Sequence, residues 1–384
     1  MATNPFVYGE VVPPSAFVDR EVELARLVND LAAGQKVFLI SPRRYGKSSL
    51  IHQTLAALAR QRVLTVEVSV ARYSSYVAFL EGFARHLLAL ERRAERARPW
   101  LAGLLDAFRA DVRVEPRAGG GQQLSVAFPM VKRNAQDEGR LAEEVFRLPG
   151  RIAEATGRRL AIALDEFQVI GAYDGGGVES ALREAVQQQR NVGYVFAGSE
   201  PTLMEQMVSP RRPFYKAGPL MRLERIPSDV FTGFVETRFR RSGFRVEKGL
   251  GMALVELAGN LPYDVQRLAH ELWDDARVAG WRVVSVETLH RTLRRLLEEQ
   301  ATLFEGLWQR LTLAQRAALR AVVLEQGREL LSADVRVRHR LGGASSVQSA
   351  LLALQRLDLV MREANGLYQV MDSLFREWVA RKTY

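Results

Sequence analysis

The sequence predicts an α/β fold with a parallel sheet, followed by a helical region and a small domain of helices and a hairpin. Short apolar runs alternate with amphipathic segments from residue 36 to residue 223, and strand patterns nearly stop after Pro227. An Asn-Gly pair stands between two short β-type runs near the C-terminus. Strands that alternate with helices typically form a parallel sheet covered on both faces. We therefore expect three domains, at residues 1–226, 227–300 and 301–384.

Five apolar, β-rich runs are the expected strands, at residues 37–40, 63–68, 160–164, 192–197 and 220–223. Two of the segments between them have helical spacing: residues 48–59, with Ile51, Leu55 and Leu58 on one face, and residues 180–189. The glycine-containing stretches 113–123 and 173–177 are expected to be loops. The segment 72–135 matches no motif.

The region after Pro227 predicts helices at residues 228–235, 250–258, 262–279 and 286–299, which we expect to form a lid domain. The last block has three helix patterns and then two short strands, 359–362 and 368–370, around Asn365-Gly366. This order is typical of a winged helix-turn-helix domain.

Composition excludes several classes of protein. The 384 residues include no cysteine, so disulfide scaffolds, cysteine nucleophiles and thiolate metal sites are excluded. No run of 18 apolar residues occurs, and the N-terminus lacks a basic region followed by an apolar block. We therefore expect a cytoplasmic protein without a membrane partner. The net charge of +10 is compatible with a phosphate-rich partner and also with a genomic preference for arginine codons.

Residues 37–49 carry the most informative motif. They read Val-Phe-Leu-Ile-Ser-Pro-Arg-Arg-Tyr-Gly-Lys-Ser-Ser, an apolar strand and a loop that opens a helix at Gly46-Lys47-Ser48. This is the order of a P-loop, although Ser41 stands where the motif has its first glycine. Gly46 lets the backbone approach phosphates, Lys47 reaches the β- and γ-phosphates and the Ser48 hydroxyl ligates Mg²⁺. The alternative is a basic loop that only caps a helix. The expected nucleotide-binding residues here are Pro42, Arg43, Arg44, Tyr45, Gly46, Lys47, Ser48 and Ser49.

A pair of carboxylates follows the third expected strand. Asp165 comes at the carboxyl end of that strand, where ligands bind in open α/β sheets, and is expected to hold Mg²⁺ with Ser48. Glu166 is expected to polarise the attacking water. A turn with two solvated carboxylates is the alternative.

Two further candidates lie downstream. Ser199 follows the strand at residues 192–197 and is placed to contact the γ-phosphate or the water. Arg211 and Arg212 lie in a basic loop, and we assign Arg212 to neutralising charge in the transition state. A strand-ending turn and a solvated surface loop are the respective alternatives.

The chain resembles the AAA-related P-loop ATPases of the archaeal ATPase family, within the wider STAND group. The matching segments are residues 4–9, 17–21, 41–50, 164–168, 196–199 and 262–266, and the C-terminal block is also similar to the family. In that family Ser-Pro-Arg-Arg is the usual opening of the loop. The resemblance implies ATP or ADP and Mg²⁺ as cofactors, Val18 and Arg20 beside the adenine, Ser199 as the first sensor and Pro262 in the lid element that closes over the nucleotide. Here that element begins with Asn260 where the family has glycine.

The C-terminal block contains a candidate recognition helix at residues 345–357. Val347, Leu351, Leu354 and Leu357 are expected to face the core. The residues available for DNA are Arg338, Arg340, Ser345, Ser346, Gln348 and Arg356. Winged helices also bind proteins, so double-stranded DNA and a protein partner both remain open.

The first functional hypothesis is an ATP-hydrolysing switch whose lid movement the winged helix reports to DNA or a protein partner. The second is an oligomeric ATPase that remodels or loads DNA, similar to origin-recognition-type initiators, with an arginine supplied by a neighbouring subunit. The third is a DNA-binding protein with a structural nucleotide site. The sequence does not identify the signal to which the protein responds or its oligomeric state. It also does not decide which arginine neutralises charge in the transition state.

Overall fold

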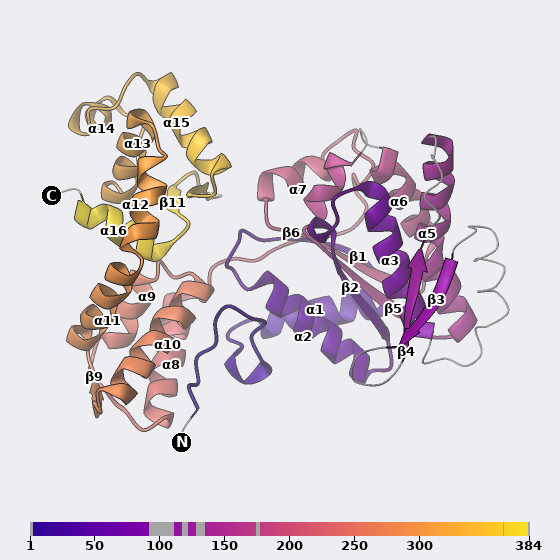
Figure 1. Ribbon diagram of the computed structural model, residues 1–384, viewed down its shortest axis with the longest axis horizontal. Coiled ribbons are helices and arrows are strands. Elements are labelled where there is room, and N and C mark those ends of the chain that lie inside the picture. Colours follow the sequence, from indigo (N-terminus) through magenta and orange to yellow (C-terminus); the bar gives the residue numbers. More distant parts are fainter. Residues whose placement is uncertain are drawn as a thin grey trace. The chain divides into compact units, whose positions relative to one another are not determined.

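The computed structural model describes residues 3–91, 111–116, 122–127, 135–173, 177–363 and 365–382. These fall into two units, coloured along the chain in Figure 1. Residues 13–224 form one, called here the sheet unit. The residues up to Val12 and those from Arg225 onward form the other, called the helical unit.

Five parallel strands form the sheet, in the order β2-β5-β6-β1-β7. They are β1 (Lys36–Ile40), β2 (Leu64–Ser69), β5 (Leu160–Asp165), β6 (Val192–Gly198) and β7 (Leu220–Arg222). All five predicted strands are confirmed. Because β6 lies between β1 and β5, the residues that follow these three strands meet at one edge of the sheet.

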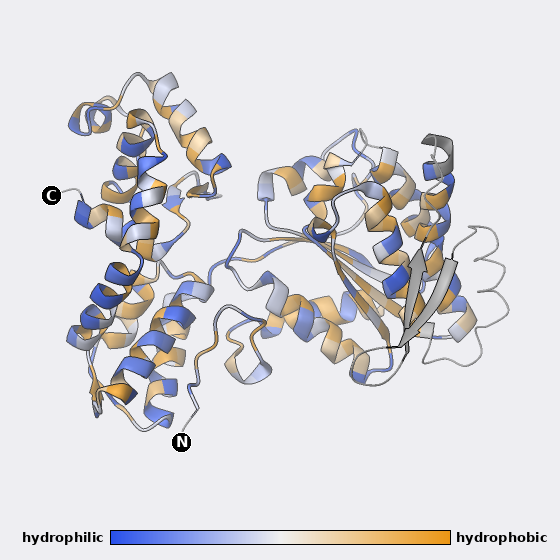
Figure 2. Cartoon of the chain, in the orientation of Figure 1, coloured by the Kyte–Doolittle hydropathy of each residue, from blue (hydrophilic) through white to orange (hydrophobic). Residues whose placement is uncertain are grey.

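Two buried clusters cover the faces of the sheet. Along β1, Val37 and Leu39 belong to one cluster, and Phe38 and Ile40 to the other. This follows from the two-residue repeat of a strand. Apolar residues run along the central strands in Figure 2, as expected for a sheet that is buried on both faces.

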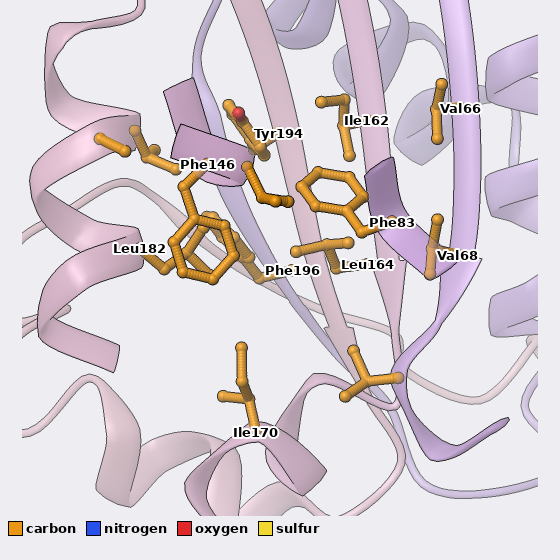
Figure 3. Close-up of a cluster of buried hydrophobic side chains, with 14 of the residues drawn as sticks. Val66, Val68, Phe83, Phe146, Ile162, Leu164, Ile170, Leu182, Tyr194 and Phe196 are labelled. Carbon is orange, nitrogen blue, oxygen red and sulfur yellow. The ribbon is translucent and has the colours of Figure 1, made fainter. Parts of the chain in front are cut away.

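Helices cover each face. The helices α1 (Glu21–Ala32) and α2 (Lys47–Arg60) pack on one cluster, and α3 (Tyr76–Glu91), α5 (Ala135–Thr156) and α6 (Gly177–Gln188) on the other. Figure 3 shows side chains of α3, α5 and α6 meeting those of β2, β5 and β6. The sheet unit also contains α7 (Pro201–Met207) and the short 3₁₀ helices η1 (Pro14–Ala16), η2 (Val70–Arg72) and η3 (Phe167–Ala172).

The prediction of a loop at residues 113–123 is wrong at both ends of that range, where the structure has strands. An antiparallel pair, β3 (Asp111–Pro116) and β4 (Gln122–Ala127), occupies most of it, and residues 117–121 lie outside the described part. The alternation of Val112, Val114, Leu124 and Val126 is a strand pattern that the neighbouring glycines and proline obscured. In the second expected loop, residues 174–176 also lie outside the described part, and α6 begins at Gly177.

The helical unit begins with the predicted helices. They are α8 (Ser228–Arg241), α9 (Leu250–Leu257), α10 (Pro262–Val278) and α11 (Val286–Glu299). Two short parallel strands, β8 (Arg245–Val246) and β9 (Val283–Val284), join their connections and were not predicted. Pro262 is the first residue of α10, a position that suits its fixed φ and missing N–H group.

The N-terminal segment packs on these helices. The Phe6 ring is 1% exposed and lies 4.8 Å from the Phe239 ring, centroid to centroid. The Asn4 side-chain amide donates to the His270 carbonyl, and the Tyr8 hydroxyl donates to Glu271 at 2.7 Å. Residues 3–12 therefore belong with the helical unit, whereas our expected first domain had included them. The chain passes between the units twice, after Val12 and after Glu224.

The C-terminal part of the helical unit has the predicted winged-helix order. It consists of α12 (Ala301–Gln309), α13 (Leu313–Leu324), α14 (Ala333–Arg338), α15 (Ala344–Arg356), β10 (Val360–Arg362), β11 (Tyr368–Val370) and α16 (Ser373–Lys382). Val347, Leu351 and Leu354 are buried as expected. Leu357 is 54% exposed, because α15 ends at Arg356 and Leu357 lies beyond its last turn. No helix in the described ranges combines the length and apolar character needed to cross a membrane.

Replacing Phe6 by alanine is expected to destabilise the helical unit by about 3–5 kcal/mol, because it leaves a cavity beside Phe239. Four of the five tryptophans lie in this unit, so urea unfolding followed by tryptophan fluorescence reports on it. Val11→Ala is the control, since Val11 is 42% exposed and should change little. Equal midpoints for the two variants would contradict a stabilising role for the packing of Phe6.

Candidate functional site

The loop between β1 and α2 has a backbone suited to binding an anion. Arg44 (φ +71°) and Gly46 (φ +89°) adopt left-handed conformations, and Gly46 caps the N-terminus of α2. A Cβ atom at Gly46 would meet no described atom within 4 Å. Helix N-terminal amides attract phosphate groups through their N–H donors and the helix dipole.

Ser41 opens this loop without the glycine of the usual motif. Its φ angle is not among the positive values, so the position does not demand glycine. The Ser41 amide donates to the Gly198 carbonyl at 3.2 Å, and its side chain is buried. The start of the loop is therefore fastened to the end of β6.

Lys47 joins the loop to the two carboxylates. Its side chain is 6% exposed, and its ammonium group forms an ion pair with Asp165 and lies 3.4 Å from Glu166 Oε1. The Ser48 hydroxyl lies 3.4 Å from Asp165 Oδ2. The structure thus brings together four residues that the sequence had placed in one site.

Glu166 is held by three donors. It has a left-handed backbone (φ +52°), and its Oε2 atom accepts hydrogen bonds from Ser199 Oγ and Gln168 Nε2, each at 2.6 Å. Burial acts to raise the pKa of Glu166, but the Lys47 charge and the hydrogen bonds from Ser199, Gln168 and Lys47 outweigh it. The net pKa is lowered, and Glu166 is an anion at neutral pH.

The donor set fits a hard divalent cation. Ser48 and Asp165 present a hydroxyl and a carboxylate oxygen to each other, and oxygen ligands of this kind suit Mg²⁺. The Lys47 ammonium faces both carboxylates. Ser48 and Asp165 would suit a magnesium ion, and their role as its ligands stays a prediction.

The remaining loop candidates surround this cluster in sequence. Tyr45 and Ser49 are buried, Pro42 and Arg44 are half-buried, and Arg43 is exposed. Near the start of the sheet unit, Val18 is half-buried, while Arg20 is 5% exposed and donates to Glu23 at 2.8 Å and to the Glu224 carbonyl. Pro262 lies in the other unit.

Arg212 has a different partner from the one that a transition-state role requires. Its guanidinium forms an ion pair with Glu179 of α6, a fully buried carboxylate. Burial raises the pKa of Glu179, although Arg212 opposes the shift. In this structure Arg212 therefore neutralises Glu179. Its role in neutralising charge in the transition state stays a prediction.

Gln168 is a residue of the site to which sequence reasoning gave no role. It lies on η3, two residues beyond Glu166, and the 3₁₀ helix turns its side chain back toward that carboxylate. A Cβ atom at Gly198 would lie 2.6 Å from Gln168 Oε1 and 2.4 Å from the Met204 side chain. Gly198 therefore makes room for Gln168. The sequence signals were a polar residue two positions after the carboxylate pair and its place at the end of the segment 164–168, which carries the family resemblance.

The candidate DNA-binding residues lie in the winged-helix part. Ser345, Ser346, Gln348 and Arg356 are exposed on α15, and Arg340 is exposed after α14. Arg338 is 61% exposed and forms an ion pair with Glu325 at 2.8 Å. The polar face of α15 is thus accessible in the helical unit.

Comparisons with known proteins agree with this architecture. Residues 302–381 match a family described as a probable winged helix domain. The Walker-type ATPase PABY2304 of Pyrococcus abyssi is similar in structure, with a TM-score of 0.60 and 18% identity over 95% of this chain and 97% of that one. The ORC1 protein of Aeropyrum pernix, solved in complex with DNA, has a TM-score of 0.54 and 13% identity over 100% of this chain and 99% of that one. No sequence among the curated proteins matches the chain. The fold is therefore that of a P-loop ATPase with a C-terminal winged helix.

Gly198→Ala is expected to destabilise the sheet unit by about 1–3 kcal/mol, the usual cost of overpacking a core. Both neighbours that the new methyl group meets, Met204 and Gln168, are buried and cannot turn into solvent. Urea unfolding followed by circular dichroism measures the change. Gly139→Ala, on α5, is the control, because its methyl group would meet no described atom within 4 Å and should stabilise the helix by about 1 kcal/mol. A Gly198→Ala protein as stable as wild type would contradict the crowding.

Proposed function

We propose that this chain binds ATP with Mg²⁺ and hydrolyses it, using the carboxyl edge of the β1, β5 and β6 strands. The observation that carries the proposal is the convergence of Lys47, Ser48, Asp165 and Glu166 at the N-terminus of α2. Cation, hydroxyl and two carboxylates at a phosphate loop are the parts that phosphoryl transfer to water needs.

The side chains divide the work between binding and chemistry. Lys47 holds the β- and γ-phosphates, and Ser48 with Asp165 holds the magnesium ion. Bound Mg²⁺ supplies neutralisation of the charge that develops on the phosphate oxygens. Lys47 now pairs with both carboxylates, so phosphate binding exchanges these contacts for phosphate oxygens.

Glu166 is the general base of the proposed reaction. A water molecule gives its proton to Glu166, its oxygen bonds to the γ-phosphorus, and the bond from that phosphorus to the bridging oxygen breaks. The products are ADP and inorganic phosphate. With Lys47 beside it, the lowered pKa keeps Glu166 deprotonated at neutral pH.

The helical unit supports a role for the winged helix in reporting lid movement. Arg225 donates to the Gly259 carbonyl after α9 at 3.0 Å and pairs with Glu363 and Gln369 of the β10–β11 hairpin. Arg376 of α16 donates to the Leu257 carbonyl at 2.8 Å. The proposed lid helices, α8 to α11, and the winged-helix part are thus joined by hydrogen bonds and an ion pair within one unit. They would therefore move together, as a nucleotide-driven switch requires.

Origin-recognition-type activity is the second candidate. It is favoured by the likeness to the DNA-bound ORC1 protein over the whole chain and by the exposed polar face of α15. In this form the protein would act on double-stranded DNA as a homo-oligomer, with Arg212 or Arg211 acting on a neighbouring subunit. The first candidate instead couples the same hydrolysis to a lid movement that the winged helix reports to DNA or a protein partner.

Glu166→Gln is expected to lower ATP turnover about 100-fold or more while nucleotide binding is retained, because only the proton acceptor is lost. Steady-state phosphate release and calorimetric ATP binding measure the two properties. The control is Glu205→Gln, which removes an exposed carboxylate of α7 that pairs with Arg222. Turnover that survives in Glu166→Gln would remove this residue from the chemistry and contradict the proposed mechanism.

Arg356→Ala is expected to weaken binding of duplex DNA several-fold and to lower the dependence of log affinity on log salt by about one, because one phosphate contact is lost. Fluorescence anisotropy with a labelled duplex over a salt series measures both. Arg291→Ala removes an exposed arginine of α11 and is the control. Equal affinities for the two variants, or no DNA binding by wild type, would favour a protein partner.

A further inference from the structure

The side chain of Gln168 is unusual among the groups around the phosphate loop. It is 7% exposed, and its Nε2 atom donates to Glu166 Oε2 at 2.6 Å and approaches Ser199 Oγ at 3.4 Å. Its Oε1 atom is buried with no hydrogen-bond partner among the described residues. A buried glutamine with a structural task would be expected to pair both ends. Only the end that faces the carboxylate is paired here.

The orientation of this amide follows from charge. The reversed orientation would bring the Gln168 carbonyl oxygen 2.6 Å from the carboxylate oxygen of Glu166, which is repulsive. The stable orientation therefore points the N–H group at Glu166 and leaves the carbonyl oxygen beside Gly198, where a side chain would collide with it. Gln168 Oε1 is therefore left without a hydrogen-bond donor among the described residues, while Gln168 Nε2 donates to the Glu166 carboxylate.

The support beneath Gln168 is rigid. The preceding residue, Phe167, is fully buried, and its ring lies 4.6 Å from the Phe196 ring and 5.4 Å from the Phe214 ring, centroid to centroid. Ile170 on the same 3₁₀ helix is also buried. Gln168 is thus held by the core under β6 and can hold Glu166 in turn.

The two oxygens of Glu166 have different surroundings. Ser199 and Gln168 both donate to Oε2, whereas among the described residues Oε1 has the Lys47 ammonium, at 3.4 Å, as its partner. In the proposed hydrolysis Lys47 turns to the phosphates, which frees Oε1 and leaves Oε2 fastened.

We propose that Gln168 is a positioning residue that, with Ser199, anchors Glu166 Oε2 and thereby presents Glu166 Oε1 to the attacking water. The inference rests on the proposed ATP hydrolysis. In the step it supports, one O–H bond of water breaks, the proton bonds to Oε1, the water oxygen bonds to the γ-phosphorus and the phosphorus–bridging-oxygen bond breaks. Gln168 exchanges no proton and contacts neither water nor phosphate.

The test replaces Gln168 by methionine, which has a similar length and no N–H donor. The expected result is a kcat about tenfold lower with KM for ATP and ATP affinity within about twofold of wild type, because the loss of one hydrogen bond to a charged group falls on the base alone. In a Glu166→Gln background the same substitution should cost nothing further, since no carboxylate remains to be anchored. Gln168→Asn keeps the amide one carbon shorter and should recover part of the lost kcat.

A second measurement is independent of turnover. With glutamine side-chain amides labelled with ¹⁵N, the nucleotide-free protein should show one amide resonance that is missing in Gln168→Met and displaced in Glu166→Gln. A Gln168 resonance that keeps its position in Glu166→Gln, beside the additional resonance of the new glutamine, would overturn the hydrogen bond itself. A wild-type kcat in Gln168→Met, or a loss equally large in the Glu166→Gln background, would overturn the positioning role. Failure of the proposed function looks different, because wild type would then hydrolyse no ATP or Glu166→Gln would remain fully active.

Discussion

Burying the ammonium group of Lys47 requires negative charge beside it, and the fold supplies that charge from Asp165 and Glu166. An isolated buried cation would cost several kcal/mol, so this pairing stabilises both the phosphate loop and the end of β5. The same ion pairs can be exchanged when a ligand binds, because negatively charged ligand oxygens compete with the two carboxylates for Lys47. One ion-pair cluster therefore links the stability of the sheet edge to phosphate binding.

The strand order explains why these side chains meet although they are more than 100 residues apart in sequence. Placing β6 between β1 and β5 brings Ser199 between the loop and the carboxylates, and the Gly198 carbonyl fastens Ser41. Glycine at this position also leaves room for Gln168. Beyond Glu224 the chain enters the helical unit. There Arg225 donates to the Gly259 carbonyl, just after α9, and pairs with Glu363 of the β10–β11 hairpin.

The features that could be predicted from the sequence are those set by neighbouring residues along the chain. Buried parallel strands give continuous apolar runs, and Gly46-Lys47-Ser48 after such a run predicts the phosphate loop. What escaped were contacts that only tertiary structure creates. The position of Gln168 depends on a 3₁₀ turn, the pairing of Arg212 with Glu179 joins segments 33 residues apart, and the packing of Phe6 on Phe239 spans much of the chain. Neither propensity nor periodicity carries information about such pairs.

Equilibrium binding of ATP to the nucleotide-free protein, with and without Mg²⁺, tests the central claim most directly. Calorimetry on wild type, Lys47→Ala and Asp165→Asn would give stoichiometry and affinity without relying on turnover. The account predicts one ATP per chain in wild type, loss of binding in Lys47→Ala, and an affinity that depends on Mg²⁺ in wild type but hardly in Asp165→Asn. ATP binding that Lys47→Ala retains in full, or no binding by wild type, would contradict the assignment of this cluster as the nucleotide site.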